Sequence, residues 1–403
     1  MIIEEIRIQN FKALKDVHLK NLPSLAVFVG KNGTGKTTLF HVFSFLKACL
    51  ANNVRSALQK EGGLRGFQEV ITRGVPLTEK IVLELKFRLD IAGANRLVTY
   101  LLEIGMEENK PIVSREVLRY KRGSYGSPFH FVDFSKGQGW AVSNEEDFSK
   151  PETELTREPQ SISPDTLAIS SLGQLERFKA AKAFRDLIAN WHISDFHISD
   201  ARGRKVQEEG VHLSSTGENL PSVAYRLHEE EPEIFKLVLE KMRQRVPGIR
   251  DIKTEVGADG SLLVRYSDGA FKDPFLDYNV SDGTIKMFAY MILLHDPIPH
   301  KILCVEEPEN QLYPELMVLL AEEFQSYAQR GGQVFISTHS PEFLNALPLD
   351  DLFVINKVAG VSEIDRCMDD PLMREQMAAG WKAGTLWQEG LLEGIQNRVV
   401  SGS

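Results

Sequence analysis

The chain is poor in cysteine, has no excess of positive charge and contains no long hydrophobic run. Its three cysteines, Cys49, Cys304 and Cys367, lack the close pairs of zinc sites and disulfide scaffolds, which favours a reducing compartment. The 47 Lys and Arg residues are outnumbered by 56 Asp and Glu, giving a formal net charge of −9. Any contact with nucleic acid must therefore use a local basic patch.

No stretch approaches the roughly 18 apolar residues that span a bilayer, and the longest apolar block covers residues 287–294. The opening MIIEEIRIQNF places two glutamates where a signal peptide needs basic residues. We therefore expect a cytoplasmic protein without a membrane anchor. The 403 residues, 42% of them hydrophobic, are enough for two or more lobes around a large core.

The hydrophobic pattern predicts three strands near residues 6–8, 17–19 and 25–29. Alternating segments between about residues 80 and 137 predict an antiparallel meander, and helices are expected at 172–189 and 232–246. From about residue 278 the order helix, strand, helix, strand is typical of a parallel sheet. The chain shows no sustained heptads, so we expect no long coiled-coil arm.

Residues 30–37 read GKNGTGKT, the P-loop pattern, between an apolar strand and a helix. Its glycines allow backbone N–H groups to surround phosphate oxygens, and the helix N-terminus adds its positive dipole. Lys36 would contact the β and γ phosphates, and the Thr37 hydroxyl would bind Mg²⁺. The candidate phosphate-binding residues are Gly30, Asn32, Gly33, Thr34, Gly35, Lys36, Thr37 and Thr38.

The segment KILCVEEPEN buries four apolar residues in a strand and places Glu306 and Glu307 at its carboxyl end. Glu306 would hold Mg²⁺, directly or through water, and Glu307 would orient and polarise the attacking water. The alternative is a strand that simply ends in solvated acids. The P-loop in the same chain favours the catalytic interpretation.

Two further segments complete the set of motifs. QVFISTHS is an apolar strand that ends near His339, in the position of a γ-phosphate sensor, although a lone histidine is often only structural. In NVSDGTIKMF, Ser281 is the expected N-cap of an apolar helix and Gly283 lies in its first turn. A serine hydroxyl and free N–H groups at a helix start form an anion site, and an ordinary capped core helix is the alternative.

These four motifs, in this order, resemble the ATPase head of the ATP-binding-cassette class. Within that class the chain resembles the soluble branch of RecF, the chromosome-maintenance proteins and the stand-alone ATPases related to OLD-family phage-defence proteins. The resemblance implies an α/β P-loop NTPase head with a mostly parallel sheet, an antiparallel β subdomain and a helical lobe. It also implies ATP and Mg²⁺ as cofactors.

The resemblance extends to the opening IRIQNFKAL, which is similar to the N-terminal strand pair of the branch and would place Lys12 near the nucleotide. Gln68 in RGFQEV is the best match to the glutamine that contacts Mg²⁺ in relatives. The signature reads Ser-Asp-Gly-Thr and the Mg²⁺ acid is Glu306, both of which look like this soluble branch. Tyr313 stands where relatives often have histidine, which puts a direct role for that position in doubt.

Four segments are expected from this resemblance. Residues 1–140 would hold the P-loop and the antiparallel β subdomain, and 141–275 an inserted helical and mixed lobe. Residues 276–360 would hold the signature, the Glu306 strand and His339, and 361–403 a tail that docks a partner.

The leading hypothesis is an ATP hydrolase that works as a switch. The resemblance implies that two heads close head to tail, as a homodimer or within a higher oligomer, so that the segment from Ser281 covers the other subunit's ATP. A second helix N-terminus would supply charge stabilisation that one P-loop lacks. Closure would control a separate effector, in anti-phage defence.

Two rival hypotheses remain. A RecF-like repair factor would bind DNA through a basic group that is otherwise a solvated surface, namely Arg177, Lys179, Lys182, Arg185, Arg202, Arg204 and Lys205. A transporter ATPase subunit is disfavoured by the long segment between the P-loop and Ser281 and by the missing Gly-Gly-Gln.

OLD-family proteins carry a Toprim nuclease after the ATPase, whereas only about sixty residues follow His339 here. These residues lack the strand-end Glu and Asp-x-Asp groups of a two-metal nuclease, so we expect a Toprim-like nuclease to act in trans. Large apolar side chains that suit either core packing or partner docking occur in the tail, namely Trp381, Leu386, Trp387, Leu391 and Leu392.

Overall fold

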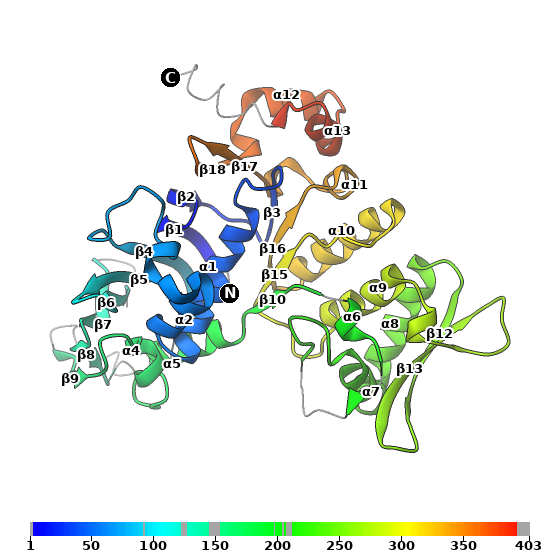
Figure 1. Ribbon diagram of the computed structural model, residues 1–403, viewed down its shortest axis with the longest axis horizontal. Helices are drawn as coiled ribbons and strands as arrows, with labels where there is room; N and C mark the ends of the chain where they lie inside the picture. The colour runs from blue at the N-terminus through cyan, green and yellow to red at the C-terminus, as the bar shows by residue number, and fades with distance from the viewer. Residues whose placement is uncertain are drawn as a thin grey trace. The chain divides into compact units, whose positions relative to one another are not determined.

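The computed structural model describes residues 3–91, 93–121, 127–144, 154–196, 198–203, 205–206 and 212–392 (Figure 1). Its contacts divide the chain into two compact units. The first contains Met1–Trp191 and Phe353–Arg366, and the second contains His192–Leu352 and Cys367–Ser403. The expected four-segment division stays a prediction, although its boundary at residue 275 falls inside the second unit.

An eight-stranded antiparallel sheet dominates the first unit, in the order β2-β1-β4-β5-β6-β7-β8-β9. Its strands are β1 (Ile3–Phe11), β2 (Leu14–Lys20), β4 (Ile81–Ile91), β5 (Ala94–Glu107), β6 (Lys110–Tyr120), β7 (Phe129–Ser135), β8 (Gln138–Val142) and β9 (Arg157–Ser161). In β4 the burial alternates with period two, as expected for a strand with one buried face. The expected meander is therefore present and continues to β9, which no clear hydrophobic alternation in the sequence indicates.

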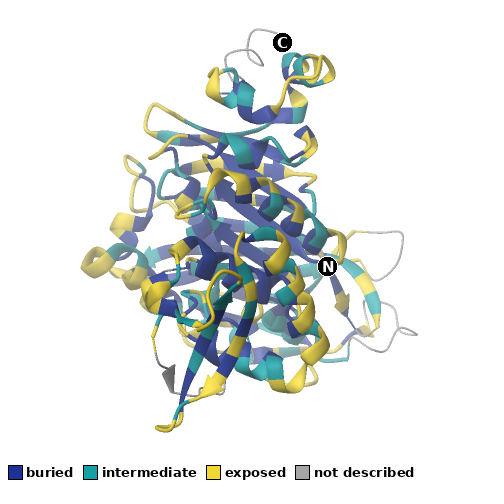
Figure 2. Cartoon of the chain, turned by 90° about the vertical axis from the view of Figure 1, so that its right-hand side faces the viewer, coloured by how far each residue is buried: buried dark blue, intermediate teal, exposed yellow. Residues whose placement is uncertain are grey.

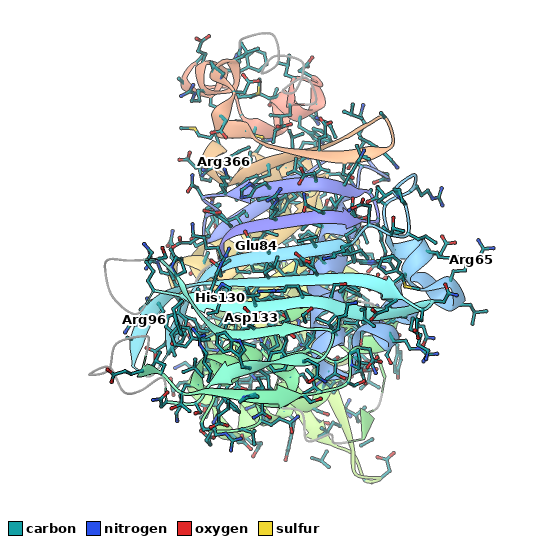
Figure 3. All side chains as sticks on the ribbon, turned by 90° about the vertical axis from the view of Figure 1, so that its left-hand side faces the viewer. Arg65, Glu84, Arg96, His130, Asp133 and Arg366 are labelled. Carbon is teal, nitrogen blue, oxygen red and sulfur yellow. The ribbon has the colours of Figure 1, made fainter. Side chains whose placement is uncertain are left out.

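The two faces of this sheet differ in chemistry. On the buried face, the ring of Phe184 from α5 (Lys179–Ala189) stacks on Phe87 with 4.7 Å between centroids. On the other face, Glu84, His130 and Asp133 project among charged neighbours (Figure 3). The Nδ1 atom of His130 lies 2.8 Å from Asp133. One face is thus core and the other a surface of mixed charge.

The remaining elements of the first unit are helices and the strands beside β3. The helical elements are α1 (Lys36–Ala51), α2 (Val54–Gly62), η1 (Gly63–Arg65), α3 (Phe67–Val70) and α4 (Ala168–Leu172). The strands are β3 (Leu25–Val29), β17 (Leu352–Val358) and β18 (Val361–Arg366), with β17 beside β3. All five residues of β3 are buried, and Phe28 stacks on Phe353 with 5.2 Å between centroids.

The second unit contains the parallel strands β10 (His192–Ser194), β15 (Ile302–Glu306) and β16 (Gln333–Thr338), in that order. The principal helices are α7 (Leu220–Glu230), α8 (Pro232–Arg245), α9 (Asp282–Leu294) and α10 (Pro314–Gln329). The shorter elements are α6 (Ile198–Ala201), η3 (Asp277–Asn279), α11 (Pro341–Leu344), η4 (Leu349–Asp351), η5 (Cys367–Asp369), α12 (Pro371–Ala378) and α13 (Ala383–Gln388). The helix, strand, helix, strand order predicted after residue 278 is confirmed.

A small antiparallel sheet also belongs to the second unit. It consists of β11 (Lys205–Val206), β12 (Ile249–Val256), β13 (Ser261–Asp268) and β14 (Phe275–Leu276), and β12 and β13 form a hairpin (Figure 1). It occupies part of the segment 141–275 that was expected to form a helical and mixed lobe. The core of the unit is densest along α9, in which every residue from Gly283 to Leu294 is buried.

One predicted helix is wrong. Residues 172–189 do not form a continuous helix, because α4 ends at Leu172 and α5 begins only at Lys179. A side chain at Gly173 would meet the Ile169 carbonyl oxygen at 2.6 Å, and residues 174–178 form a turn. The periodic hydrophobic positions continue across the break, so the sequence pattern alone merges the two helices.

Buried residues follow the strands and the inner faces of the helices, while exposed residues gather on loops and outer faces (Figure 2). Among the described residues, no helix has both the length and the apolar content to cross a membrane. The longest described helices, α1 and α10, have 16 residues. The absence of a coiled-coil arm stays a prediction.

Candidate nucleotide site

The P-loop of the first unit links buried β3 to α1, as the sequence predicts. Lys36, only 5% exposed, donates from Nζ to the Gly30 carbonyl at 2.7 Å and to the Lys31 carbonyl at 3.3 Å. Its ammonium group is therefore held inside the loop. A phosphate that enters the loop would replace these carbonyls as the partner of Lys36.

Gly35 is required by both conformation and space. Its φ is 111°, in the left-handed region, and a Cβ atom there would lie 2.2 Å from Oγ of Ser362. Ser362 in β18 donates to the Thr34 carbonyl at 2.6 Å and thereby braces the loop. Sequence analysis missed this brace, because Ser362 lies 328 residues from Thr34.

The other loop candidates surround the start of α1. Asn32, Gly33 and Thr37 are exposed, Thr38 is half-buried, and the Thr34 hydroxyl donates to the Lys31 carbonyl at 2.9 Å. Thr37 therefore lies at the helix start with its side chain accessible, as a Mg²⁺ ligand requires. Their roles in binding stay predictions.

Lys12, the predicted nucleotide contact, already has partners within the first unit. Its Nζ lies 2.6 Å from Glu61 Oε2 and 2.8 Å from His41 Nδ1. Burial raises the pKa of Glu61, but hydrogen bonds from His41 and Lys12 outweigh it and lower this pKa. A role of Lys12 at the nucleotide would thus compete with this ion pair. Gln68, the predicted Mg²⁺ contact, is exposed on α3.

In the second unit, acidic and imidazole groups gather at the carboxyl ends of β15 and β16. Glu306 ends β15, and Glu307 follows with φ 41°, a left-handed conformation uncommon for residues other than glycine. The Glu307 N–H donates to the Ser337 carbonyl at 2.9 Å, which fixes this turn to β16. His339 Nδ1 lies 3.6 Å from Glu307 Oε1. The structure thus brings together the predicted Glu307 and His339.

Glu309 is a member of this group that the motif analysis did not assign. Its Oε1 accepts hydrogen bonds from the His339 N–H at 2.7 Å and from the Thr338 hydroxyl at 2.8 Å. The same oxygen lies 3.3 Å from His339 Nδ1. Glu309 therefore positions the histidine loop. The run EEPEN in the sequence shows that several acids follow the strand, but it does not indicate which of them faces β16.

These groups adjoin a cavity of about 470 Å³ in the second unit. It is lined by Asp195, Phe196, Ile198, Ser199, Arg202, Asp282, Lys286, Glu306, Glu307, Asn310 and Gln311. Four of these side chains are carboxylates, and two, Arg202 and Lys286, are cationic. The lining of the cavity is mainly polar, with side chains of both charges.

Lys286 is a second residue that sequence analysis missed, because it reads as one polar position in an apolar helix. It is 3% exposed and its Nζ donates to the Asn310 carbonyl at 2.8 Å. Burial lowers the pKa of Lys286 to about 8, although the charges of Glu309, Asp195 and Glu307 act to raise it. Lys286 therefore links α9 to the segment that follows Glu307.

We expect the contribution of Lys286 to the free energy of unfolding to depend on pH. Between pH 8 and 10.5 the unfolded chain binds more protons at Lys286 than the native chain, so native stability rises with pH. Relative to Lys286→Met, the free energy of unfolding of the wild type should rise by about 3 kcal/mol between pH 7 and 10.5. Urea unfolding of both proteins across this range measures the difference. A difference that stays constant with pH would contradict the buried cationic assignment.

The predicted signature helix is also present. Ser281 is the N-cap of α9, and its Oγ accepts from the Thr284 N–H at 3.3 Å. Gly283 lies in the first turn, where a Cβ atom would meet the Gln311 carbonyl oxygen at 3.0 Å. Close packing of the helix start against the chain after Glu307 therefore favours glycine at this position. The role of Ser281 and Gly283 at a nucleotide stays a prediction.

Arg202 corrects one assignment. It was grouped with a basic nucleic-acid patch, but its guanidinium donates to the carbonyls of Asp277 and Val280 and pairs with Asp282. Arg202 thus holds the segment that leads into the signature helix. Arg204 lies outside the described residues, as does the side chain of Lys205.

The other basic candidates all lie near carboxylates in the first unit. Arg177 is 3.2 Å from Glu158, Lys179 is 3.9 Å from Glu176, and Arg185 is 3.2 Å from Asp186. Lys182 also pairs with Glu176. This pairing matches a solvated surface more closely than an uncompensated basic patch.

Known proteins of similar sequence include the DNA replication and repair protein RecF of Lactococcus lactis subsp. cremoris. The chain is 27% identical to RecF of strains SK11 and MG1363 over 151 residues, 35% of this chain and 40% of each relative. The match therefore spans about two fifths of the length of these curated relatives.

Solved structures of similar fold include two heads of SMC proteins. One, bound to the C-winged helix domain of ScpA, is 12% identical, with a TM-score of 0.53 and coverage of 91% of this chain and 97% of the other. The other, from Pyrococcus furiosus and solved with the C-terminal domain of ScpA, is 11% identical, with a TM-score of 0.51 and coverage of 93% and 99%. The chain thus has the fold of an SMC- and RecF-like ATPase head.

A family model covers most of the chain, matching residues 25–345. The match begins in β3, directly before the P-loop, and ends after α11, beyond the His339 loop. ATPases of this type use ATP and usually Mg²⁺. The chain belongs to the family described as "AAA domain, putative AbiEii toxin, Type IV TA system".

Proposed function

We propose that this protein is a Mg²⁺-dependent ATP hydrolase whose nucleotide cycle drives a dimer switch. The observation that carries the proposal is the group at the carboxyl ends of β15 and β16, where Glu307 lies 3.6 Å from His339 and Glu309 fixes the histidine loop. Such a pair can orient water and sense a γ-phosphate. The fold shared with SMC- and RecF-like heads supports the assignment.

Each residue has a proposed role in this reaction. Lys36 neutralises the β and γ phosphates, and Thr37 and Glu306 bind Mg²⁺. Glu307 polarises the attacking water, and His339 contacts the γ-phosphate. Glu307 and His339 act with little reorganisation, since the Glu307 N–H donates to the Ser337 carbonyl of β16 and the His339 N–H donates to the Glu309 carboxylate.

The dimer is supported by the geometry of the signature helix. Ser281 uses its hydroxyl to cap α9, and the helix start presents N–H groups that suit an anion. We propose that these groups of one subunit contact the ATP bound to the P-loop of the other. A charged phosphate would then stabilise closure, and hydrolysis would release it.

Ser281→Arg tests this contact. We expect ATP affinity to stay within about twofold, while hydrolysis falls about 100-fold, because a loss near 3 kcal/mol is typical when a transition-state donor is removed. Asn53→Arg is a matched control, because Asn53 caps α2 through a 2.8 Å bond to the Ser56 N–H. If both variants lose hydrolysis to the same extent, the loss at Ser281 reflects helix capping. That result, or full hydrolysis by Ser281→Arg, would refute the dimer contact.

The finer proposal concerns what the switch controls. We propose a separate effector, a Toprim-like nuclease in anti-phage defence, that is held or released by the ATP cycle. Of the tail side chains considered for docking, Leu386 and Leu392 are fully buried, and the Trp387 indole donates to the His339 carbonyl at 3.2 Å. Trp381 is 43% exposed, so an effector would contact the tail through Trp381 and its neighbours.

The tail thus corrects part of the docking hypothesis. A Cβ atom at Gly384 would lie 1.9 Å from the Pro341 carbonyl oxygen, so α13 packs closely against α11 beside the His339 loop. Deleting residues 381–403 would expose this core. The full chain is therefore the appropriate protein for the experiment. It is held in the ATP-bound state and tested for binding of the effector. Residues 393–403 lie outside the described part of the chain.

A RecF-like DNA-binding function is the second candidate. The sequence match to RecF of Lactococcus lactis favours it. The pairing of Arg177, Lys179 and Lys182 with carboxylates argues against the surface first considered. DNA affinity that falls steeply with salt would favour this candidate.

A further inference from the structure

A cluster of imidazole and carboxylate groups lies in the second unit, away from Glu306 along the same strands. His192 begins β10, and His300 lies two residues before the start of β15, so both lie at the amino-terminal ends of these parallel strands. Glu306 ends β15, four residues after the first residue of that strand and therefore about 13 Å further along. The cluster is therefore separate from the proposed nucleotide group.

Three side chains of the cluster point their ligand atoms at one another. His212 Nδ1 lies 2.8 Å from Asp296 Oδ2, and one ligand atom from each of His212, Asp296 and His300 lies within 4.8 Å of the others. The rings of His212 and His300 have centroids 4.6 Å apart. His192 stacks on His300 at 4.6 Å and closes one side.

The backbone around these residues is fixed by hydrogen bonds from other side chains. Asn219 donates to the His212 carbonyl at 2.9 Å, and the Tyr327 hydroxyl donates to the His300 carbonyl at 2.6 Å. Asp296 Oδ1 accepts from the Ile298 N–H at 2.8 Å, which leaves Oδ2 directed at His212. Such support from outside the ligand set is typical of built metal sites.

The burial of the cluster also suits a bound ion. The Asp296 side chain is 3% exposed and His300 is buried, whereas the His212 side chain is 29% exposed. Two ligands are therefore shielded from water, and the third lies at an entry path. A buried carboxylate next to two imidazoles is favourable when a cation neutralises it.

We propose that His212, Asp296 and His300 bind a divalent transition-metal ion of the zinc type. Imidazole nitrogen and carboxylate oxygen are ligands that Zn²⁺ takes, with bonds of about 2.0 to 2.2 Å. Ligand atoms on a tetrahedral ion then lie about 3.4 Å apart, so small rotations of the two rings convert the present arrangement into a coordination sphere. A fourth position remains for water or His192.

The bound ion would connect three segments that are distant in sequence. His212 precedes α7, Asp296 follows α9, and His300 leads into β15. Metal binding would thus stabilise the amino-terminal side of the parallel strands in the second unit, and the proposal does not depend on ATP hydrolysis. The motif analysis missed it, because His212 lies 84 residues from Asp296.

The test uses the full chain stripped with EDTA and titrated with Zn²⁺, and with Co²⁺ as a spectroscopic probe. We expect one ion per chain, a visible Co²⁺ absorption typical of a low-coordinate site, and a melting temperature raised by about 5 to 10 °C at 100 times Kd. His212→Gln should weaken Zn²⁺ affinity at least about 100-fold, more than loss of a supporting group does.

Two controls separate this site from other binding. His228→Gln changes another half-buried histidine, which bonds Thr254 at 2.9 Å, and should leave affinity unchanged. Glu306→Gln should also retain it, which excludes the Mg²⁺ site as the source. If His300→Gln does not fold, two other measurements test the proposal. They are the Zn²⁺ affinity of His212→Gln, at a half-exposed position, and the Co²⁺ spectrum of the wild type. Absence of saturable Zn²⁺ binding, or affinity unchanged in His212→Gln, would overturn the proposal.

Discussion

Replacing Lys36 with alanine is expected to lower ATP affinity at least about 100-fold, which in practice abolishes binding. Lys36 is buried in the P-loop and its Nζ is held by the Gly30 and Lys31 carbonyls, at the position where phosphate oxygens would lie. Two charge-assisted hydrogen bonds to phosphate account for about 3 kcal/mol, or more than 100-fold. Fluorescent ATP binding in the presence of Mg²⁺ measures the loss.

Lys31→Ala is the matched control, because Lys31 is a neighbouring lysine of the same loop with an exposed side chain. It should bind ATP within a few fold of the wild type. We expect Lys36→Ala to stay folded, which circular dichroism measures. Undiminished ATP affinity in folded Lys36→Ala would refute the phosphate site.

Replacing Glu307 with glutamine is expected to reduce ATP turnover about 1,000-fold while ATP still binds. The amide keeps the shape of the side chain, and its backbone keeps the 41° φ and the bond to Ser337, but it loses the charge that polarises water. Phosphate release under saturating ATP and Mg²⁺ measures turnover. The same protein should accumulate in the ATP-bound state.

Glu315→Gln provides the control for this substitution, since Glu315 is exposed in the first turn of α10. Its turnover should match that of the wild type. If Glu307→Gln keeps turnover within a few fold, the catalytic glutamate is misassigned. Glu306→Gln and Glu309→Gln would then identify the catalytic acid.

The sequence was most informative where structure and chemistry are local. A buried strand, a glycine-rich loop and a helix follow one another around Lys36, and one strand ends at Glu306, so a short stretch of sequence carries each motif. The N-cap at Ser281 is equally local. Such features depend on neighbouring residues, and the pattern therefore predicts them.

The sequence failed where contacts join distant segments. Arg202 pairs with Asp282 across 80 residues, and Lys12 pairs with Glu61 across 49. A basic side chain gives no indication of which carboxylate it meets after folding. For this reason the sequence suggested Arg202 as part of a nucleic-acid surface. It also suggested Lys12 as a nucleotide contact and gave no sign of its pairing with Glu61.

Secondary structure failed for a related reason. The break between α4 and α5 interrupts a hydrophobic pattern that is compatible with one helix, and the close approach at Gly173 is set by packing. In the hairpin, β12 has several exposed positions, whereas every residue of β13 is buried or half-buried, so the two strands do not share one clear alternating pattern.

The most direct test of the account is the mass of Glu307→Gln in solution with and without ATP and Mg²⁺, measured by sedimentation. The account predicts a monomer without nucleotide and a dimer with ATP and Mg²⁺, and no such shift when Lys36→Ala or Ser281→Arg is added to Glu307→Gln. A Glu307→Gln protein that binds ATP but has the same mass with and without it would contradict the nucleotide-driven switch.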